Sequence, residues 1–236
     1  MFAGFAWRSL LLVLIAGLVT ACAAPPPLPT QVTAPPEALA QQQRASLLWQ
    51  QQQWSFSAQI AVFDLVADDR HAAYIEWRQQ PNRSFLRFYH PLRGTLAELN
   101  VSPTEAVLID ADGNERRALS AETLLRQQLG LNIPLRLLQA VVIGKLPERA
   151  GMIEYYQDGT VATYAVPATR QLWQVNLSRY QAVNRTHSKL TNGDSAAPTA
   201  FQLPNAISLE SEAYRLKLAV SNWQLPALAS LESVAQ

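Results

Sequence analysis

The sequence has a single cysteine, Cys22, among 236 residues, and almost no net charge. One thiol excludes an internal disulfide, and it also excludes a zinc site built from several thiolates. The 19 Lys and Arg residues nearly balance the 18 Asp and Glu residues. Nucleic-acid binding needs a basic patch that displaces counterions, so we expect no nucleic-acid partner.

Patterns that mark common catalytic sites are also absent from the sequence. The histidines are His71, His90 and His187, and none occurs at a metal-ligand spacing such as His-Glu-x-x-His. Asp68, Asp69 and His71 could be arranged around a metal ion, but a solvated turn is the simpler interpretation. The sequence has no Gly-x4-Gly-Lys-Ser/Thr loop for a nucleotide and no Gly-x-Ser-x-Gly elbow for a hydrolase. We therefore expect no metal, no other cofactor and no enzymatic activity.

The apolar run at the N-terminus is short. Residues 10–19 would extend about 15 Å as a helix, whereas a bilayer core needs roughly 30 Å. The run fits a secretory signal, and Val19-Thr20-Ala21-Cys22 resembles the lipobox of bacterial lipoproteins. We predict that residues 1–21 are a cleaved signal peptide and that Cys22 is lipidated through its nucleophilic thiolate. The alternative is an ordinary secreted protein with a cysteine at this position by chance.

A proline-rich segment follows Cys22. Residues 23–40 contain no aromatic side chain, and their prolines favour extended polyproline II structure. We predict a tether over 22–40, one domain over 41–224, and an extension over 225–236 to which we assign no role. The tether prolines are Pro25, Pro26, Pro27, Pro29, Pro35 and Pro36.

The domain alternates between apolar and polar residues in the manner of β-strands. Trp54, Phe56 and Ile60 share one face of a strand, opposite Ser55 and Ser57. Asp112-Gly113 is a strong hairpin signal. The pattern predicts strands at 54–62, 73–77, 85–89, 95–101, 106–110, 115–119, 151–156, 161–166, 172–178, 206–209 and 214–220.

Three helices are predicted beside these strands. Good helix formers over 37–53 predict a short helix packed on the domain. Ser120 is a good N-cap for a helix that ends at Gly130, and Pro134 fits the first turn of another that Gly144 closes. The last helix is apolar nearly all round, so we expect it to be buried. The simplest arrangement is mainly β with α, a curved antiparallel sheet wrapped around helices.

Several segments match a known family when they are taken in order. They are the aromatic strand ending at Trp77, Pro91-Leu92 followed by Thr95-Leu-Ala-Glu-Leu-Asn100, Ile133-Pro134-Leu135 leading to Ile143-Gly144, and Leu216-Lys217-Leu218 leading to Asn222-Trp223. In this order, behind a lipobox, they resemble the LolB family of outer-membrane lipoprotein receptors. The resemblance implies an open (incomplete) antiparallel β-barrel with a helical lid, LolA/LolB-like. It also implies an apolar cavity for lipoprotein acyl chains, a lipid anchor in the outer membrane, and a partner, the periplasmic carrier LolA.

The resemblance also assigns candidate site residues. The family has a loop whose leucine, in an Asn-Pro-Leu-Gly setting, projects into solvent and assists membrane insertion. Pro91 and Leu92 match that loop, although Arg93 separates Leu92 from Gly94. We expect a monomer. The candidate cavity lining, whose members could each also be ordinary core residues, is Trp54, Phe56, Ile60, Ala73, Ile75 and Trp77.

Two other classes of protein stay open as alternatives at this point. A lipid-modifying or cell-wall enzyme on a lipoprotein anchor would hydrolyse a lipid substrate. A purely structural envelope lipoprotein would need no cavity and would bind no lipid.

The lipobox makes a direct prediction about mass. Protein extracted from membranes should start at Cys22 and carry three acyl chains, and intact-mass spectrometry measures both properties. Ala23 is not an aspartate, which in enteric-type sorting implies export to the outer membrane. An unmodified Cys22, or a chain that retains residues 1–21, would contradict this prediction.

Overall fold

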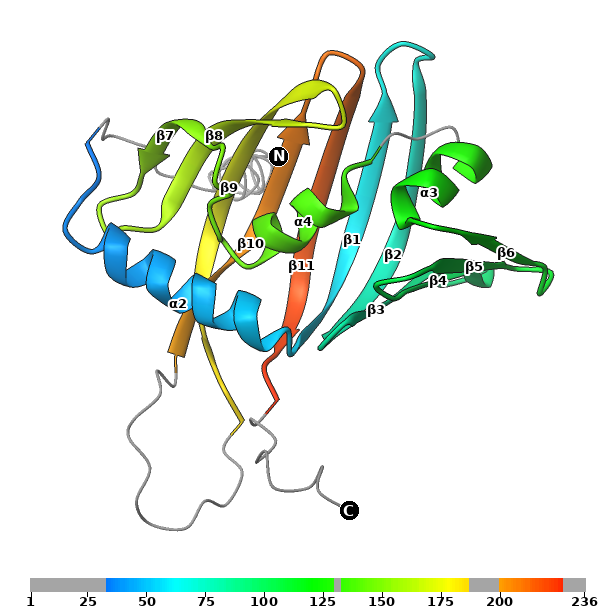
Figure 1. The fold of residues 1–236 in the computed structure, drawn as a ribbon, viewed down its shortest axis with the longest axis horizontal. Helices are drawn as coiled ribbons and strands as arrows, with labels where there is room; N and C mark the ends of the chain where they lie inside the picture. The colour runs from blue at the N-terminus through cyan, green and yellow to red at the C-terminus, as the bar shows by residue number, and fades with distance from the viewer. Residues whose placement is uncertain (1–32, 130–132, 187–199, 227–236) are drawn as a thin grey trace, which may run out of the picture.

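The computed structural model of the chain describes residues 33–129, 133–186 and 200–226. In these ranges an antiparallel sheet of eleven strands curls around three helices (Figure 1). The helices are α2 Ala38–Gln51, α3 Ala121–Leu129 and α4 Leu135–Val142. The strands are β1 Trp54–Asp64, β2 Asp69–Gln80, β3 Arg83–His90, β4 Gly94–Val101, β5 Ala106–Asp110, β6 Glu115–Ala118, β7 Gly151–Tyr155, β8 Val161–Ala168, β9 Gln171–Asn184, β10 Ala200–Glu210 and β11 Tyr214–Gln224.

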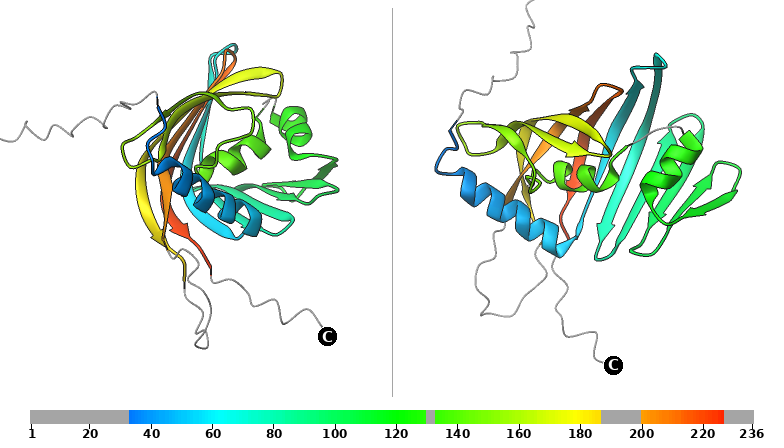
Figure 2. Two further views of the ribbon diagram at one scale, coloured as in Figure 1. Left: turned by 60° about the vertical axis from the view of Figure 1, so that its left-hand side comes forward. Right: turned by 45° about the horizontal axis from the view of Figure 1, so that its top comes forward.

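The sheet is open. Its strand order is β6-β5-β4-β3-β2-β1-β11-β10-β9-β8-β7, so β6 and β7 are edges that do not pair with each other. Figure 2 shows the sheet bent around the helices, which lie on its concave side. Register shifts at Ser57/Ala58 and Phe88/Tyr89 add bends of the kind that bulges produce. The open antiparallel barrel with helices inside is therefore confirmed.

Side-chain alternation determines which face of the sheet is inside. On β1, Trp54, Phe56 and Val62 are buried, while Ser55 and Ser57 face outward and are partly exposed. Hydrogen-bonded pairing with β2 on one side and β11 on the other places β1 in the middle of the sheet. The most hydrophobic strand face thus lies where helices can cover it.

The helices form where local signals predict them. Ser120 accepts a hydrogen bond from the Thr123 backbone N–H (3.2 Å), which is the expected cap of α3. In α4, six of eight residues are buried, in agreement with its apolar sequence. The helix predicted over 37–53 is observed as α2, which begins at Ala38 inside the range predicted for the tether.

The observed strands β9 and β10 are longer than the patterns predict. Arg179 has a positive φ of 55°, which interrupts the alternation and hides the continuation of β9. Pro204 lies inside β10, and proline is normally excluded from strand interiors because it has no N–H to donate. Leu225, in the segment to which we assigned no role, is buried and forms an isolated bridge with Arg185. The signal peptide, Cys22 and His187 lie outside the described residues.

One glycine allows the start of α2 to pack on the β7–β8 turn. Gly159 has φ +81°, and a Cβ there would lie 2.5 Å from the backbone carbon of Glu37. Gly113, in the β5–β6 turn, has a similar φ of +83° with open space around it.

Alanine substitutions at these two glycines distinguish the cost of backbone strain from the cost of a close contact. Gly113→Ala should lower the free energy of unfolding by about 1–2 kcal/mol, because only the left-handed backbone is penalised. Gly159→Ala should cost at least about 2 kcal/mol more, because α2 must shift away. Chemical unfolding of both variants in detergent measures this difference. Equal losses would show that α2 does not depend on this contact.

Candidate functional site

Four of the six candidate cavity residues lie in the packed core. Trp54, Phe56, Ile75 and Trp77 are each no more than 3% exposed. The ring centroids of Trp54 and Trp77 lie 5.4 Å apart, and Phe56 and Trp223 are separated by 4.8 Å. These side chains pack on one another, and they belong to the same hydrophobic cluster as most of the buried residues of α4.

The other two candidates are only partly buried. Ile60 and Ala73 are cross-strand partners on β1 and β2. Phe88 on β3 faces Ile75 on one side and Ala97 on the other, so it lies on the same inner face. We refer to Ile60, Ala73, Phe88 and Ala97 as the half-buried row. It crosses four neighbouring strands between the packed core and the β3–β4 turn.

Phe88 and Ala97 are not among the residues selected from the sequence. The segment 85–89 is apolar on both faces, so alternation alone does not reveal which of Phe85 and Phe88 points inward. The pairing of Phe88 with Ile75 decides it. Register between strands was therefore the missing signal.

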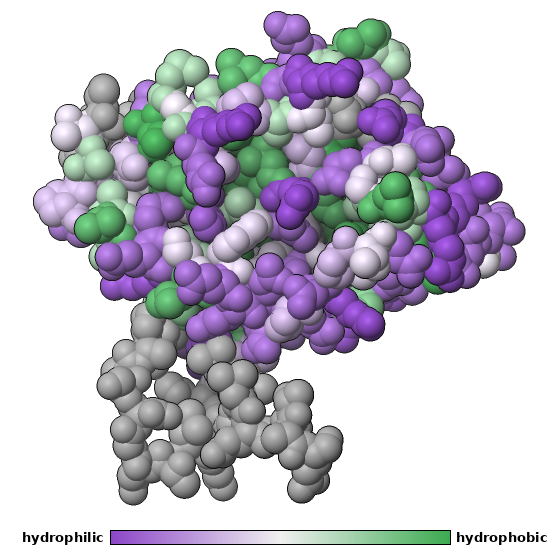
Figure 3. All heavy atoms as spheres, viewed as in Figure 1, coloured by the Kyte–Doolittle hydropathy of each residue, from purple (hydrophilic) through white to green (hydrophobic). Residues whose placement is uncertain are grey.

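The interior is uncharged. The fully buried polar side chains of the described residues are Gln79, Ser84, Thr160 and Ser211, none of which ionises. Burial raises the pKa of the Tyr164 and Tyr180 hydroxyls, so both stay protonated. Figure 3 looks onto the helical side and shows apolar residues at the bottom of a hollow rimmed by polar ones.

Glutamine side chains attach α4 at two points. Gln139 donates to Ser84 Oγ (2.9 Å), and Ser84 in turn donates to Gln79 Oε1 (2.6 Å). After the helix, Gln42 of α2 donates to the Gly144 carbonyl (3.0 Å) and accepts from the Leu146 N–H (2.9 Å). These bonds connect α4 to the β2–β3 hairpin and to α2 without any ion pair.

The β3–β4 turn presents Leu92 to solvent. The Leu92 side chain is 91% exposed and does not fold back onto the core. The turn is ordered by two hydrogen bonds, from the Leu92 N–H to His90 Nδ1 (3.2 Å) and from the Arg93 N–H to the His90 carbonyl (3.1 Å). Gly94, with φ +75°, resumes the strand after the inserted Arg93.

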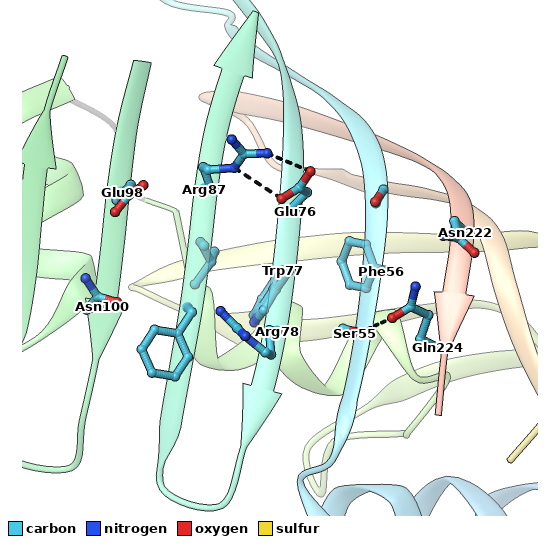
Figure 4. A pocket seen from close by; sticks show the side chains of 13 residues that line it. Ser55, Phe56, Glu76, Trp77, Arg78, Arg87, Glu98, Asn100, Asn222 and Gln224 are labelled. Carbon is cyan, nitrogen blue, oxygen red and sulfur yellow. Dashed lines mark hydrogen bonds and ion pairs between the residues drawn. The ribbon is translucent and has the colours of Figure 1, made fainter. Parts of the chain in front are cut away.

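A groove of about 460 Å³ lies on the outer face of the same strands (Figure 4). Its lining is polar: Arg87 forms a bidentate ion pair with Glu76 (2.8 and 3.1 Å), and Ser55 donates to Gln224 (3.4 Å). An acyl chain bound here would remove water from these polar groups and offer them no hydrogen bonds in return. This groove is therefore unsuited to lipid.

The acidic turn after β1 is open to solvent. Asp69 and His71 contact each other at 3.1 Å, and both side chains are about 60% exposed. Within the described ranges, no group of three His, Cys, Asp or Glu side chains could hold a metal ion. None of the helices described is long and apolar enough to span a bilayer.

Known proteins are similar in sequence to this chain over most of its length. The model of a family described as outer membrane lipoprotein LolB matches residues 52–223. The outer-membrane lipoprotein LolB of Vibrio cholerae is 27% identical over 68% of this chain and 73% of its own. That of Vibrio atlanticus is 24% identical over 91% of this chain and 95% of its own. A crystal structure of a LolA superfamily protein from Nitrosomonas europaea covers 81% of this chain and 94% of its own, with TM-score 0.48 and 10% identity.

The match to the family model covers well over half of the chain and includes the aromatic core, the Leu92 turn, α3 and α4, whereas α2 lies just before it. The chain therefore belongs to the LolB family of outer-membrane lipoproteins, which are receptors in lipoprotein sorting and not enzymes.

Proposed function

We propose that this protein, anchored through acylated Cys22, accepts lipoproteins from the carrier LolA and inserts them into the outer membrane. The cargo acyl chains would bind between the sheet and α4. The observation that carries the proposal is the half-buried row, which leads from the uncharged interior toward exposed Leu92. An acyl chain leaving the interior along this row would reach the turn that presents Leu92 to solvent.

Exposing acyl chains to water costs so much free energy that their transfer needs a protected path. Each methylene left in water costs about 0.8 kcal/mol, so lipoprotein cargo cannot cross the periplasm unshielded. Transfer from the interior of LolA to this interior, and then to the bilayer, keeps the chains out of water. With no nucleotide-binding loop in the sequence, each step would run downhill in affinity.

The packed interior must open to admit a chain. The aromatic side chains and the buried residues of α4 belong to one packed cluster, so uptake would displace α4 from the sheet. The Gln139 and Gln42 side-chain amides bond a hydroxyl and a backbone carbonyl, and hydrogen bonds between such neutral groups exchange readily for water. Trp77 Nε1 is a buried donor with no partner among the described residues, and an ester carbonyl of the cargo would satisfy it.

Phe88 and Phe85 offer a matched pair for testing acyl binding. Both lie on β3 and are partly buried, but Phe85 faces outward, with the Arg78 guanidinium 5.2 Å from its ring centroid. A photoreactive benzoylphenylalanine at position 88 should cross-link to the acyl chains of cargo delivered by LolA, and one at position 85 should not. Mass spectrometry of the adducts locates the cross-link. Equal labelling at the two positions would place the chains outside the interior.

Leu92 tests insertion separately from binding. Leu92→Glu should leave capture of cargo from LolA within about twofold of wild type, because the side chain touches no core residue. Delivery into liposomes should fall by roughly 30-fold, the equivalent of the ~2 kcal/mol that a leucine gains in lipid. Leu119→Glu, at a second exposed leucine, serves as the control. Normal delivery by Leu92→Glu would remove this residue from the mechanism.

A further inference from the structure

The turns that join neighbouring strands at one end of the sheet expose apolar side chains. Register places the β1–β2, β3–β4 and β10–β11 turns at this end, with the start of β9 nearby. The exposed large apolar side chains there include Val66 (81%), Leu92 (91%) and Leu172 (59%). Leu92 is therefore one of several exposed apolar residues at this end of the sheet.

The β1–β2 hairpin projects beyond the Leu92 turn. Its strand β2 continues from Tyr74, which pairs with Tyr89 of β3, to Asp69. That is five residues at about 3.4 Å each, or about 17 Å of additional strand. Figure 2 (right) shows this cyan hairpin extending past its green neighbours, and Figure 3 shows hydrophobic colouring at its tip.

The tip of this hairpin is ordered. Asp64 accepts hydrogen bonds from the Val66 and Ala67 N–H groups (3.0 and 2.9 Å). The Leu65 N–H donates to the Ala213 carbonyl of the β10–β11 turn (2.8 Å). Three backbone N–H groups of the tip are thus satisfied within the protein, while the side chains of Leu65 and Val66 are 40% and 81% exposed. An apolar surface that is held in place in this way needs little ordering when it binds.

Charges around the tip are balanced. Behind it, Arg70 and Lys217 lie over the Phe63 ring, at 5.3 and 6.0 Å from its centroid. The neighbouring turns carry acidic as well as basic side chains, so attraction to anionic lipid would not dominate a membrane contact. The charged side chains at this end include Asp64, Asp68, Asp69, Glu210 and Glu212 as well as Arg70, Arg93, Arg170, Arg215 and Lys217.

The position of the tether is consistent with a membrane at this end. Ten residues separate Cys22 from Thr33, the first described residue, and the eleven steps from Cα to Cα can span at most about 40 Å. The segment 33–37 rises from the start of α2 toward the side at which the β1–β2 hairpin points (Figure 1, and Figure 2, left). The anchor would hold the domain with this end near the bilayer.

We propose that the tip of the β1–β2 hairpin, Leu65 and Val66, is a second membrane-contact element that enters the bilayer surface beside Leu92. This inference rests on the proposed function, because it takes the anchor at Cys22 and the role of Leu92 as given. The bound surface is lipid of any headgroup charge, since burial of the two apolar side chains supplies the affinity.

Fluorescent probes at single cysteines test this inference in the full-length lipidated protein. Acylation leaves Cys22 without a thiol, so Val66→Cys can be labelled uniquely with an environment-sensitive dye. In phosphatidylcholine vesicles its emission should shift to shorter wavelength, and shallow nitroxide lipids should quench it several-fold more than a probe at Leu119→Cys. Adding anionic phosphatidylglycerol should leave both signals within about twofold. Leu119 is 88% exposed and follows β6, beside the β4–β5 turn at the other end of the sheet.

The same vesicle measurements distinguish a failure of this inference from a failure of the proposed function. A probe at Leu92→Cys that enters lipid while the Val66 probe stays in water would overturn the second contact and leave the role of Leu92 intact. Both probes in water would overturn both. A Val66 probe that changes only when LolA is added would assign the tip to a protein partner and likewise overturn the inference.

Discussion

The apolar inner face of an open sheet must be covered, and the rest of this structure follows from that constraint. A closed barrel would bury its interior without help, but here β6 and β7 remain edges. The cover is made by α2, α3 and α4. Six of the eight residues of α4 are buried, and five of these belong to the shared core. Because α4 is short, its own backbone hydrogen bonds stabilise it little. Instead, the Gln139 side chain bonds Ser84, and the Gln42 side chain bonds the Gly144 carbonyl just beyond the end of the helix.

The same constraint makes the fold suitable for lipid. A surface covered by a short apolar helix can in principle be covered by an acyl chain instead, because both remove hydrocarbon from water to a similar degree. No fully buried side chain in the described part of the chain is charged, and the polar groove of the outer face keeps its own hydrogen bonds. The two faces of one sheet are thus chemically distinct, and the proposed lipid transfer uses only the inner one.

Much of this architecture could be predicted from local patterns. The alternation that begins at Trp54, the hairpin at Gly113, the Ser120 cap and the apolar residues of α4 each correspond to an observed element. Features set by contacts between distant segments could not be predicted. The inward direction of Phe88 depends on pairing with β2, and the close approach of α2 to Gly159 joins residues more than a hundred positions apart. The projecting β1–β2 hairpin likewise depends on where β3 stops pairing.

The central claim is that α4 separates from the sheet to admit acyl chains. Gln139 and Ser84 lie in side-chain contact across this junction, so cysteines at both positions can be joined by a short thiol-reactive cross-linker with a reducible central bond. Binding of a fluorescent fatty acid by the Ser84→Cys, Gln139→Cys protein measures uptake directly. We expect the cross-linked protein to lose binding and to regain it when the cross-linker is cleaved by reduction. Equal binding by the cross-linked and cleaved forms would contradict the account.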